Sequence, residues 1–320
     1  MGMVKVSICI PTYNNVQEVK HLLDSVYEQS YKNIEVNVSD DSTNSEIEEL
    51  AKVYQKRFEE EHIAFHYVHN HKPLGHIFNW NAAIEMATGE YIKIMFSDDW
   101  FTETSSLSEF VRMLEENPTA DIAFSGSRQV FLADEKMDKL KQQINASEKK
   151  NYDRWASEEF LTKLRKDYRH LFLGNQIGAP SAVIYRRKQV AALFDEESNW
   201  ASDIFLYFDI LRENPSFVST KAPLISIGVH EHQYTESFTD KDMRIYNDYR
   251  YLYTKYGLHE SKDCKTFFLK KFIVKYRMGM QEAVRLEIGR AAYVVACIME
   301  FTDTLKCFIS SRIKRWYKVG

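Results

Sequence analysis

Apolar and polar positions follow two alternating periods over the first hundred residues of this 320-residue chain. Apolar runs, each followed by a loop, predict four strands at 4–10, 34–38, 63–68 and 91–96, of which the first is expected to be buried. Apolar residues at helical spacing predict the intervening helices near 19–26, 43–61 and 78–87. This β-α-β-α order predicts an α/β fold, with a mostly parallel sheet covered by helices.

The second part of the chain repeats strand-like patterns at longer intervals. Strands are predicted at 122–124, 130–132, 181–185 and 217–229, and a helix at 201–211. The charged stretch 134–170 is expected to be helix or loop, and only helices are expected after residue 240. We therefore divide the chain into an α/β domain, residues 1–238, and a helical C-terminal region, residues 239–320.

Three polar loops, 11–14, 40–42 and 97–100, follow predicted strands, at the edge where open α/β sheets bind ligands. No G-x-G-x-x-G fingerprint and no phosphate-binding P-loop motif occurs in the sequence. Two of the loops contain paired carboxylates, at 40–41 and 98–99. Either pair alone is more typical of a turn or helix cap. Both pairs at successive strand ends favour Mg²⁺ or Mn²⁺ bound beside a phosphate-bearing ligand.

Four ordered motifs resemble those of family 2 glycosyltransferases with the GT-A fold. They lie at 6–15, 36–43, 74–81 and 87–99, and the resemblance extends over roughly residues 4–235. The resemblance implies a nucleotide-diphosphate sugar donor held by residues 1–100 and an acceptor held by residues 101–238. It also implies an inverting transfer that depends on a divalent cation, Mn²⁺ or Mg²⁺.

The resemblance assigns the nucleotide to residues of the first half. It implies that the backbone at Pro11 and the ring of Tyr13 hold the base, and that Asp41 accepts from a base N–H. A carboxylate can accept the N3–H of uracil or thymine, which agrees with a UDP- or dTDP-sugar donor. Gly75 and Asn81 match the loop and helix that close over the donor.

The resemblance also implies the metal site. Asp98 is expected near the ribose, Asp99 on the metal, and His230 near the metal or the diphosphate. A solvent-facing loop histidine is the alternative interpretation of His230. The family motif often has an earlier acid where this chain has Phe96, so Asp99 is the only carboxylate the resemblance assigns to the metal.

On the acceptor side, the small-residue loop with Gly178, Pro180 and Ser181 resembles the loop that admits the acceptor sugar. Asp203 resembles the base of inverting members, although Ser202 stands where the family has a first acid. A helix N-terminal charge is the alternative interpretation of Asp203. The expected activity is transfer of a sugar to a hydroxyl of a glycan or lipid-linked glycan in surface polysaccharide synthesis. A nucleotide-sugar-binding partner subunit without transfer activity is the alternative.

The formal net charge of −4 hides an uneven distribution. Residues 261–320 hold 13 Lys and Arg against 5 Asp and Glu, whereas the other 260 residues hold 29 against 41. The acidic body disfavours nucleic acid as a partner. Aromatic and aliphatic residues interleaved with Lys and Arg over 306–318 are typical of a helix on an anionic membrane surface. Packing against the chain's own domain and dimerisation are the alternatives for this segment.

The cysteines and the ends of the chain bear on its compartment. Four cysteines without a C-x-x-C pair predict neither a zinc site nor a disulfide framework and fit a reducing environment. The start of the sequence lacks a signal-peptide pattern. The longest apolar run of the tail, 291–299, is far shorter than the roughly 20 residues that span a bilayer. We expect a cytoplasmic protein, peripheral on the inner face of the plasma membrane through its tail.

Overall fold

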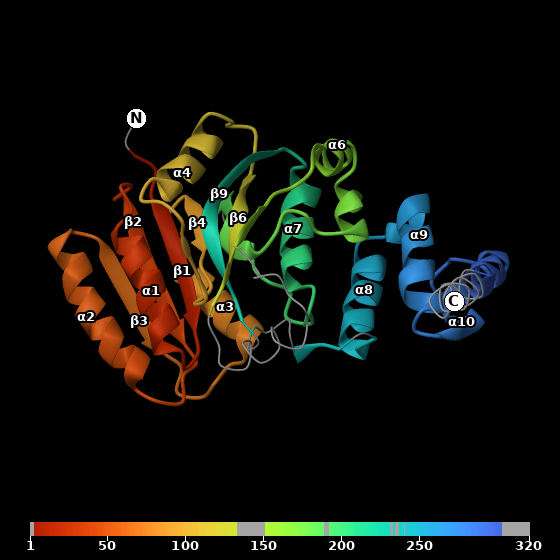
Figure 1. Ribbon diagram of the computed structural model, residues 1–320, viewed down its shortest axis with the longest axis horizontal. Coiled ribbons are helices and arrows are strands. Elements are labelled where there is room, and N and C mark those ends of the chain that lie inside the picture. The colour runs from red at the N-terminus through yellow and green to blue at the C-terminus, as the bar shows by residue number, and fades with distance from the viewer. Residues whose placement is uncertain are drawn as a thin grey trace, which may run out of the picture. The chain divides into compact units, whose positions relative to one another are not determined.

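The computed structural model describes residues 3–132, 151–188, 192–230, 233, 237–239 and 241–302 (Figure 1). The chain separates into two units, Met1–Phe238 and Thr239–Gly320. Part of the charged stretch 134–170 and the end of the basic tail lie outside the described residues.

The N-terminal half alternates strands with helices, as the sequence pattern predicts. Its elements are β1 (Val6–Thr12), α1 (Val16–Tyr27), β2 (Ile34–Asp40), α2 (Glu46–Glu60), β3 (Ala64–His69), α3 (His76–Glu85) and β4 (Tyr91–Ile94). The four strands lie in the order β3-β2-β1-β4, and all three pairings are parallel. Figure 1 shows α1 and α2 side by side over these strands. The carboxyl ends of β1, β2 and β4 therefore meet at one edge.

The second half extends the same sheet. Its elements are β5 (Asp99–Phe101), α4 (Ser106–Glu115), β6 (Ile122–Phe131), β7 (Tyr152–Arg154), α6 (Glu158–Lys166), β8 (Val183–Arg186), α7 (Ser202–Glu213) and β9 (Phe217–Val229). The sheet continues from β4 through β8, β6 and β9 to β5, with β7 beside β6. β6 and β9 are parallel, whereas β8, β5 and β7 pair antiparallel with their neighbours. The α/β fold with helices on the sheet is confirmed.

Two features of this half differ from the sequence pattern. The predicted strands at 122–124 and 130–132 form one strand, β6, whose pairing with β9 shifts register around Gly126. The predicted loop 97–100 runs into a short strand, β5, because Asp99 pairs with Ile227 in β9. A pairing so distant in sequence leaves no local signal.

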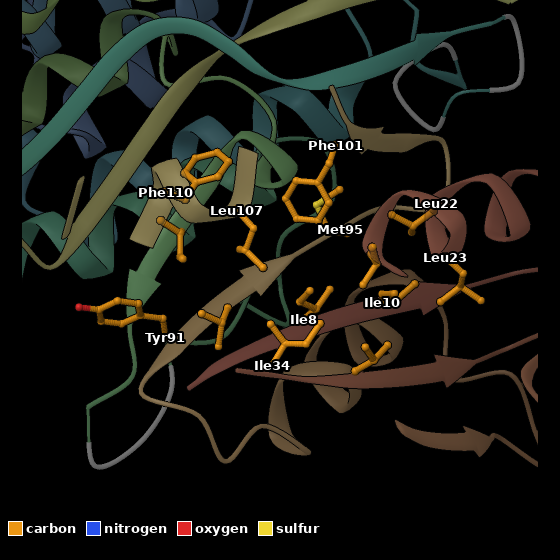
Figure 2. Close-up of a cluster of buried hydrophobic side chains, with 14 of the residues drawn as sticks. Ile8, Ile10, Leu22, Leu23, Ile34, Tyr91, Met95, Phe101, Leu107 and Phe110 are labelled. Atoms are coloured by element: carbon orange, nitrogen blue, oxygen red, sulfur yellow. The ribbon is translucent and has the colours of Figure 1, made fainter. Parts of the chain in front are cut away.

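The core of this unit is continuous across the sheet (Figure 2). In Figure 2, Phe101 lies between Leu22 of α1 and Phe110 of α4, above Ile8 and Ile10 of β1. All five side chains are buried. The strand that begins with Asp99 is therefore attached to the core by Phe101.

The C-terminal unit is helical over its described residues, as predicted. It contains α8 (Met243–Lys255), the 3₁₀ turn η4 (Leu258–Glu260), α9 (Lys262–Phe268), the π-helical η5 (Leu269–Val274), α10 (Gly279–Arg285) and a helix over 290–302. Buried aromatic rings join α8 to α9, with Tyr253 stacked on Phe268 at 4.7 Å between centroids. Within the described ranges, no helix has the length and apolarity needed to cross a membrane.

Candidate functional site

The loops after β1 and β2 hold each other in place at the carboxyl edge of the sheet. The Asp41 backbone N–H donates to the Thr12 carbonyl at 3.0 Å, and the Asn14 N–H donates to Ser42 Oγ at 2.8 Å. Asn14 has a φ of 57°, a left-handed conformation that Asn tolerates better than most residues. The two polar loops therefore form one connected surface at the edge of the sheet.

Asp40 and Asp41 have different environments. Asp40 is fully buried, where Oδ1 accepts from Thr12 at 2.9 Å and from the Ser42 N–H at 3.0 Å. Its Oδ2 accepts from the Tyr67 hydroxyl at 2.7 Å. These partners belong to the turn and to the neighbouring strand. Asp40 is therefore the turn-forming acid of the pair. Asp41, also buried at 3% exposure, has its hydrogen-bond partners in the loop that leads into α3.

Asp41 organises the loop that leads into α3. Its carboxylate accepts from Asn70 Nδ2 at 2.9 Å, from the Leu74 N–H at 3.0 Å and from the Gly75 N–H at 2.9 Å. Gly75 has a φ of 88°, and an added Cβ there would meet no atom within 4 Å. The backbone angle, rather than lack of space, is what requires glycine. A carboxylate has about four acceptor positions, so one remains for a ligand.

The two residues that the resemblance assigns to the nucleobase differ in exposure. Pro11 is buried in β1 beside Ser39 of β2. Tyr13, at the start of the following loop, is 58% exposed. An exposed ring beside the Asp41 loop is suited to stacking on a flat ligand. Binding of a base by these residues stays a prediction.

Asn81 of α3 connects the two halves of the unit, and Asn79 of the same helix contacts β1 within the first half. The Asn81 amide donates to the Phe194 carbonyl at 2.9 Å and accepts from the Phe194 N–H at 2.8 Å. Asn79 Nδ2 donates to the Thr12 carbonyl at 3.0 Å. Both side chains are buried. The contacts of Asn81 position the segment around Phe194, and its predicted contact with a donor is not tested by them.

Asp98 faces a histidine that lies more than 130 positions away in the chain. His230 Nε2 lies 3.5 Å from Asp98 Oδ2 and 3.6 Å from Oε1 of Glu18 in α1. Gln233 Nε2 lies 3.4 Å from the same Asp98 oxygen. His230 lies near Asp98 because β9 pairs with β5 and ends immediately before His230. The sequence motifs predict the Asp98 and His230 positions, but Glu18 carries no signal of its own beyond its place in the first turn of a helix.

Asp99 lies deeper than Asp98. It is buried at the start of β5, and burial together with the charge of Asp98 raises its pKa well above the usual range. A hydrogen bond from Ser181 and the charge of Lys93 act in the opposite direction. A divalent cation at this position would favour the ionised carboxylate. Asp98 and Asp99 therefore form an acidic pair in which loss of the Asp99 proton is disfavoured unless a cation is bound.

The described residues contain no group of three or more His, Cys, Asp or Glu side chains arranged to hold a metal. Mg²⁺ commonly uses one or two protein carboxylates together with phosphate oxygens of its substrate. Asp99, with Asp98 beside it and His230 across from Asp98, provides a donor set of that kind. The residues fit a cation that is completed by a ligand rather than held by the protein alone.

Asp203 lies in the first turn of α7, and its carboxylate accepts two hydrogen bonds. Its Oδ2 accepts from Asn175 Nδ2 at 2.6 Å, and its Oδ1 accepts from the Ile204 N–H at 2.8 Å. Burial raises its pKa to about 6, although both hydrogen bonds act to lower it. The carboxylate is therefore ionised at neutral pH and is a stronger base than an ordinary Asp. Ser198, in the segment before α7, donates from its Oγ to Ser202 Oγ at 2.9 Å.

Asn175 shapes the loop in front of Asp203, although the sequence analysis assigns it no role. Its Oδ1 accepts from the Ile177 N–H at 2.9 Å and the Gly178 N–H at 3.3 Å, in an Asx turn. The Gly178 carbonyl accepts from the Tyr207 hydroxyl at 3.0 Å, and Gly178 has a φ of 103°. One asparagine therefore sets both the loop conformation and the orientation of the carboxylate.

Pro180 and Ser181 attach this loop to the other cluster. They begin a 3₁₀ turn, Pro180–Ala182 (η2), and both are buried. Ser181 Oγ accepts from the Phe96 N–H at 3.0 Å and also bonds to Asp99. The contacts of Ser181 are thus on the side of the acidic pair. The prediction that these residues face an acceptor stays a prediction.

The chain was compared with known families and proteins. Residues 7–194 match the family model described as Glycosyl transferase family 2. An uncharacterised glycosyltransferase of Rickettsia felis is 31% identical over 113 residues, which is 35% of this chain and 18% of that protein. Abequosyltransferase RfbV of Salmonella typhimurium is 33% identical over 102 residues, 31% of this chain and 30% of that protein. This chain therefore matches less than a third of either relative's length.

Among solved structures, S. aureus TarS residues 1–349 in complex with UDP-GlcNAc superposes with a TM-score of 0.59. The match has 17% sequence identity and covers 91% of this chain and 79% of that one. At that identity the likeness concerns the fold. The sheet order described above is accordingly the GT-A arrangement.

Proposed function

Since the chain belongs to glycosyl transferase family 2, we propose that it transfers a sugar from a UDP- or dTDP-sugar to a hydroxyl of a glycan or lipid-linked glycan. The reaction inverts the anomeric centre, and Asp203 is its base. Surface polysaccharide synthesis is the proposed process. RfbV, by its name an abequosyltransferase, and TarS, solved with UDP-GlcNAc, support a nucleotide-sugar-dependent transfer.

The observation that carries this proposal is the environment of Asp203. Its carboxylate is oriented by Asn175, stands behind the small-residue loop at Gly178, and has a pKa raised to about 6. A general base performs best when its pKa approaches the working pH while it remains ionised. In the proposed step Asp203 takes the proton of the acceptor hydroxyl. The hydroxyl oxygen bonds to the anomeric carbon from the opposite side as the carbon–oxygen bond to the diphosphate breaks.

On the donor side, the proposal uses Asp41, Tyr13 and the backbone at Pro11. The remaining acceptor position of Asp41 would take the N3–H of uracil or thymine, and the exposed Tyr13 ring would stack on the base. Cytosine lacks an N3–H, so this arrangement favours a uridine or thymidine nucleotide.

Asp99 is proposed to hold Mg²⁺ or Mn²⁺, with Asp98 and His230 on the donor side of the same cluster. When bound, such a cation acts as a Lewis acid that stabilises the leaving diphosphate. The protein's own contribution is positional. β9 brings His230 to Asp98, and Ser181 fixes the buried Asp99 carboxyl relative to the Asp203 loop.

The first prediction tests Asp203 as the general base. In a panel of nucleotide sugars with Mn²⁺ or Mg²⁺, the wild type should release nucleotide from a UDP- or dTDP-sugar. Asp203→Asn should lower kcat by about 10²–10⁴-fold, because it removes general-base catalysis while keeping the size of the side chain. Asp209→Asn, on the same helix, is the matched control and should keep near wild-type activity. The measurement is the rate of nucleotide release at saturating donor.

The same experiment separates the alternative, a partner subunit that binds nucleotide sugar without transferring it. Ser202 supplies no acid beside Asp203, and Phe96 stands where an earlier acid is expected, which is what supports that alternative. Calorimetry that detects donor binding, with no nucleotide release by the wild type and no effect of Asp203→Asn, would establish it. No binding of any nucleotide sugar would overturn both proposals.

A further inference from the structure

The helix over 290–302 presents apolar side chains to solvent. Five of them are 43–68% exposed: Val294, Val295, Ile298, Met299 and Phe301. At about 100° per residue they fall on one half of the helix, with only Ala291 and Thr302 between them and no charged residue. Ala296, on the opposite side, is buried. We call these five residues the 290–302 face.

A face of this kind indicates an occupant. Soluble monomers rarely expose contiguous apolar patches larger than a few hundred Å². Single exposed apolar residues are common, but five on half of a 13-residue helix are not a scattered set. A lipid surface and a second copy of this chain are two occupants with suitable chemistry.

Charge distinguishes the two occupants. Residues 303–320, which follow the described helix in the sequence, contain five Lys and Arg and one acidic residue, Asp303. Residues 261–320 together carry 13 basic and 5 acidic side chains. Pairing two copies through this face would bring two segments of strongly positive charge together. An anionic surface would instead attract them, by about 1 kcal/mol for each Lys or Arg near the headgroups, which is about fivefold in affinity.

We propose that the 290–302 face inserts into the interface of an anionic lipid bilayer, with the basic residues that follow it bound to headgroups. Arg290 and Glu300 lie outside the apolar half of the described helix, so the helix is placed in the plane of the surface with its charged side toward water. An interfacial helix buries its apolar face about 5–10 Å into the boundary between headgroups and acyl chains. This inference does not depend on the proposed transfer activity.

The test measures co-sedimentation of the full chain with vesicles, in the absence of any nucleotide sugar. Vesicles of equal parts phosphatidylcholine and phosphatidylglycerol should bind the protein. Vesicles of phosphatidylcholine alone should bind it at least tenfold more weakly. Raising the salt from about 0.05 M to about 0.5 M should weaken binding to the anionic vesicles about tenfold, because headgroup attraction is screened. Equal partition onto both kinds of vesicle would overturn the proposal.

Two variants separate the apolar and the basic contributions. Val295→Glu combined with Ile298→Glu should reduce binding to anionic vesicles at least tenfold, because carboxylates cannot enter the apolar boundary. Val53→Glu is the matched control, since Val53 is 56% exposed on α2 and Val295 is 55% exposed. It should bind like the wild type. Lys314→Gln combined with Arg315→Gln should reduce binding about 25-fold while leaving the apolar face intact.

The competing occupant gives a different result. If the face joins two copies, light scattering will show a wild-type dimer in solution that Val295→Glu with Ile298→Glu converts to a monomer, and neither protein will bind vesicles. Circular dichroism and the melting temperature of each variant confirm that it is folded. Vesicle binding that the glutamates leave unchanged would also overturn the proposal.

Discussion

At the scale of single residues, Asn175 has more influence on the candidate site than its place in a loop suggests. It orients the Asp203 carboxylate and closes the turn that ends at Gly178. Its hydrogen bond also lowers the pKa of Asp203, against the effect of burial. The contact is a charge-assisted one, of a kind that contributes about 1.5–3 kcal/mol.

Asn175→Ala should therefore act through Asp203. Without the donor the pKa of Asp203 rises above about 6, so the acidic limb of the kcat–pH profile moves to higher pH. At neutral pH kcat should fall about tenfold to a hundredfold while the KM for the donor changes little. Asn175→Asp, which cannot donate to the carboxylate, should not rescue the profile. A profile identical to the wild type in either variant would show that Asn175 only shapes the loop.

Lys93 is a second residue with an unusual environment. It is fully buried in β4, where its Nζ donates to the Ser181 carbonyl and lies 4.9 Å from the centre of the Phe110 ring. Burial lowers its pKa to about 7, although the charge of Asp99 acts to raise it. In the unfolded chain the same amine keeps its proton to about pH 10.5.

The stability of the protein should depend on pH through Lys93. Between about pH 7 and 10 the unfolded state binds more protons at this site, so the contribution of Lys93 to stability becomes more favourable as pH rises. Lys93→Met lacks this dependence. The free energy of unfolding of Lys93→Met minus that of the wild type, measured in urea titrations, should be about 2 kcal/mol larger at pH 7 than at pH 9. Lys52→Met, at an exposed position, is the control, and a pH-independent difference would contradict the explanation.

At the scale of elements, β9 assembles much of the site. It pairs with β6 along most of its length and with β5 near its end, which places Asp99 opposite Ile227. The Gly228 N–H donates to the Asp98 carbonyl at 2.9 Å, and His230 follows directly. A Cβ at Gly228 would lie 2.6 Å from that carbonyl oxygen, so only glycine permits the approach.

Gly228→Ala should consequently separate β9 from the turn at Asp98. Forcing a methyl group into this contact costs about 1–3 kcal/mol, or a fall in melting temperature of several degrees. Because Asp98 and Asp99 move with the turn, donor KM should rise as well. Gly174→Ala is the control for stability, since a Cβ there meets no atom within 4 Å. An unchanged melting temperature and KM would mean that the turn adapts without cost.

At the scale of the molecule, the candidate site lies across both halves of the first unit. Asp41 and Asp98 follow strands of the first half, while Asp203 and His230 belong to the second. The halves join through antiparallel pairing of β4 with β8 and through the Asn81–Phe194 contacts. A site divided in this way requires both halves to be folded.

The apolar runs predict the first four strands because the signal is local; β1, β2 and β4 are buried throughout, whereas β3, at the edge of the sheet, is mostly exposed or half-buried. It does not predict β5, whose three residues depend on a partner more than 120 positions away. The motifs predict Asp203, but Asn175 and Glu18 carry no pattern that marks them. Asn175 reaches Asp203 from a turn in its loop, and Glu18 meets His230 because β9 brings that histidine close. Both contacts join segments that are distant in the sequence.

The contacts of the Asp41 carboxylate limit which substitutions could change the nucleotide selectivity of the protein. The carboxylate is committed to the loop through the Leu74 and Gly75 amides, and in the proposed function its remaining acceptor position reads the base. Replacing it to suit another nucleotide would also release that loop. In the proposed function the sugar and the acceptor are assigned to other residues, so mutation should alter the selection of either more readily than the selection of the nucleobase. The nucleotide is the part of the donor that this scaffold is least free to exchange.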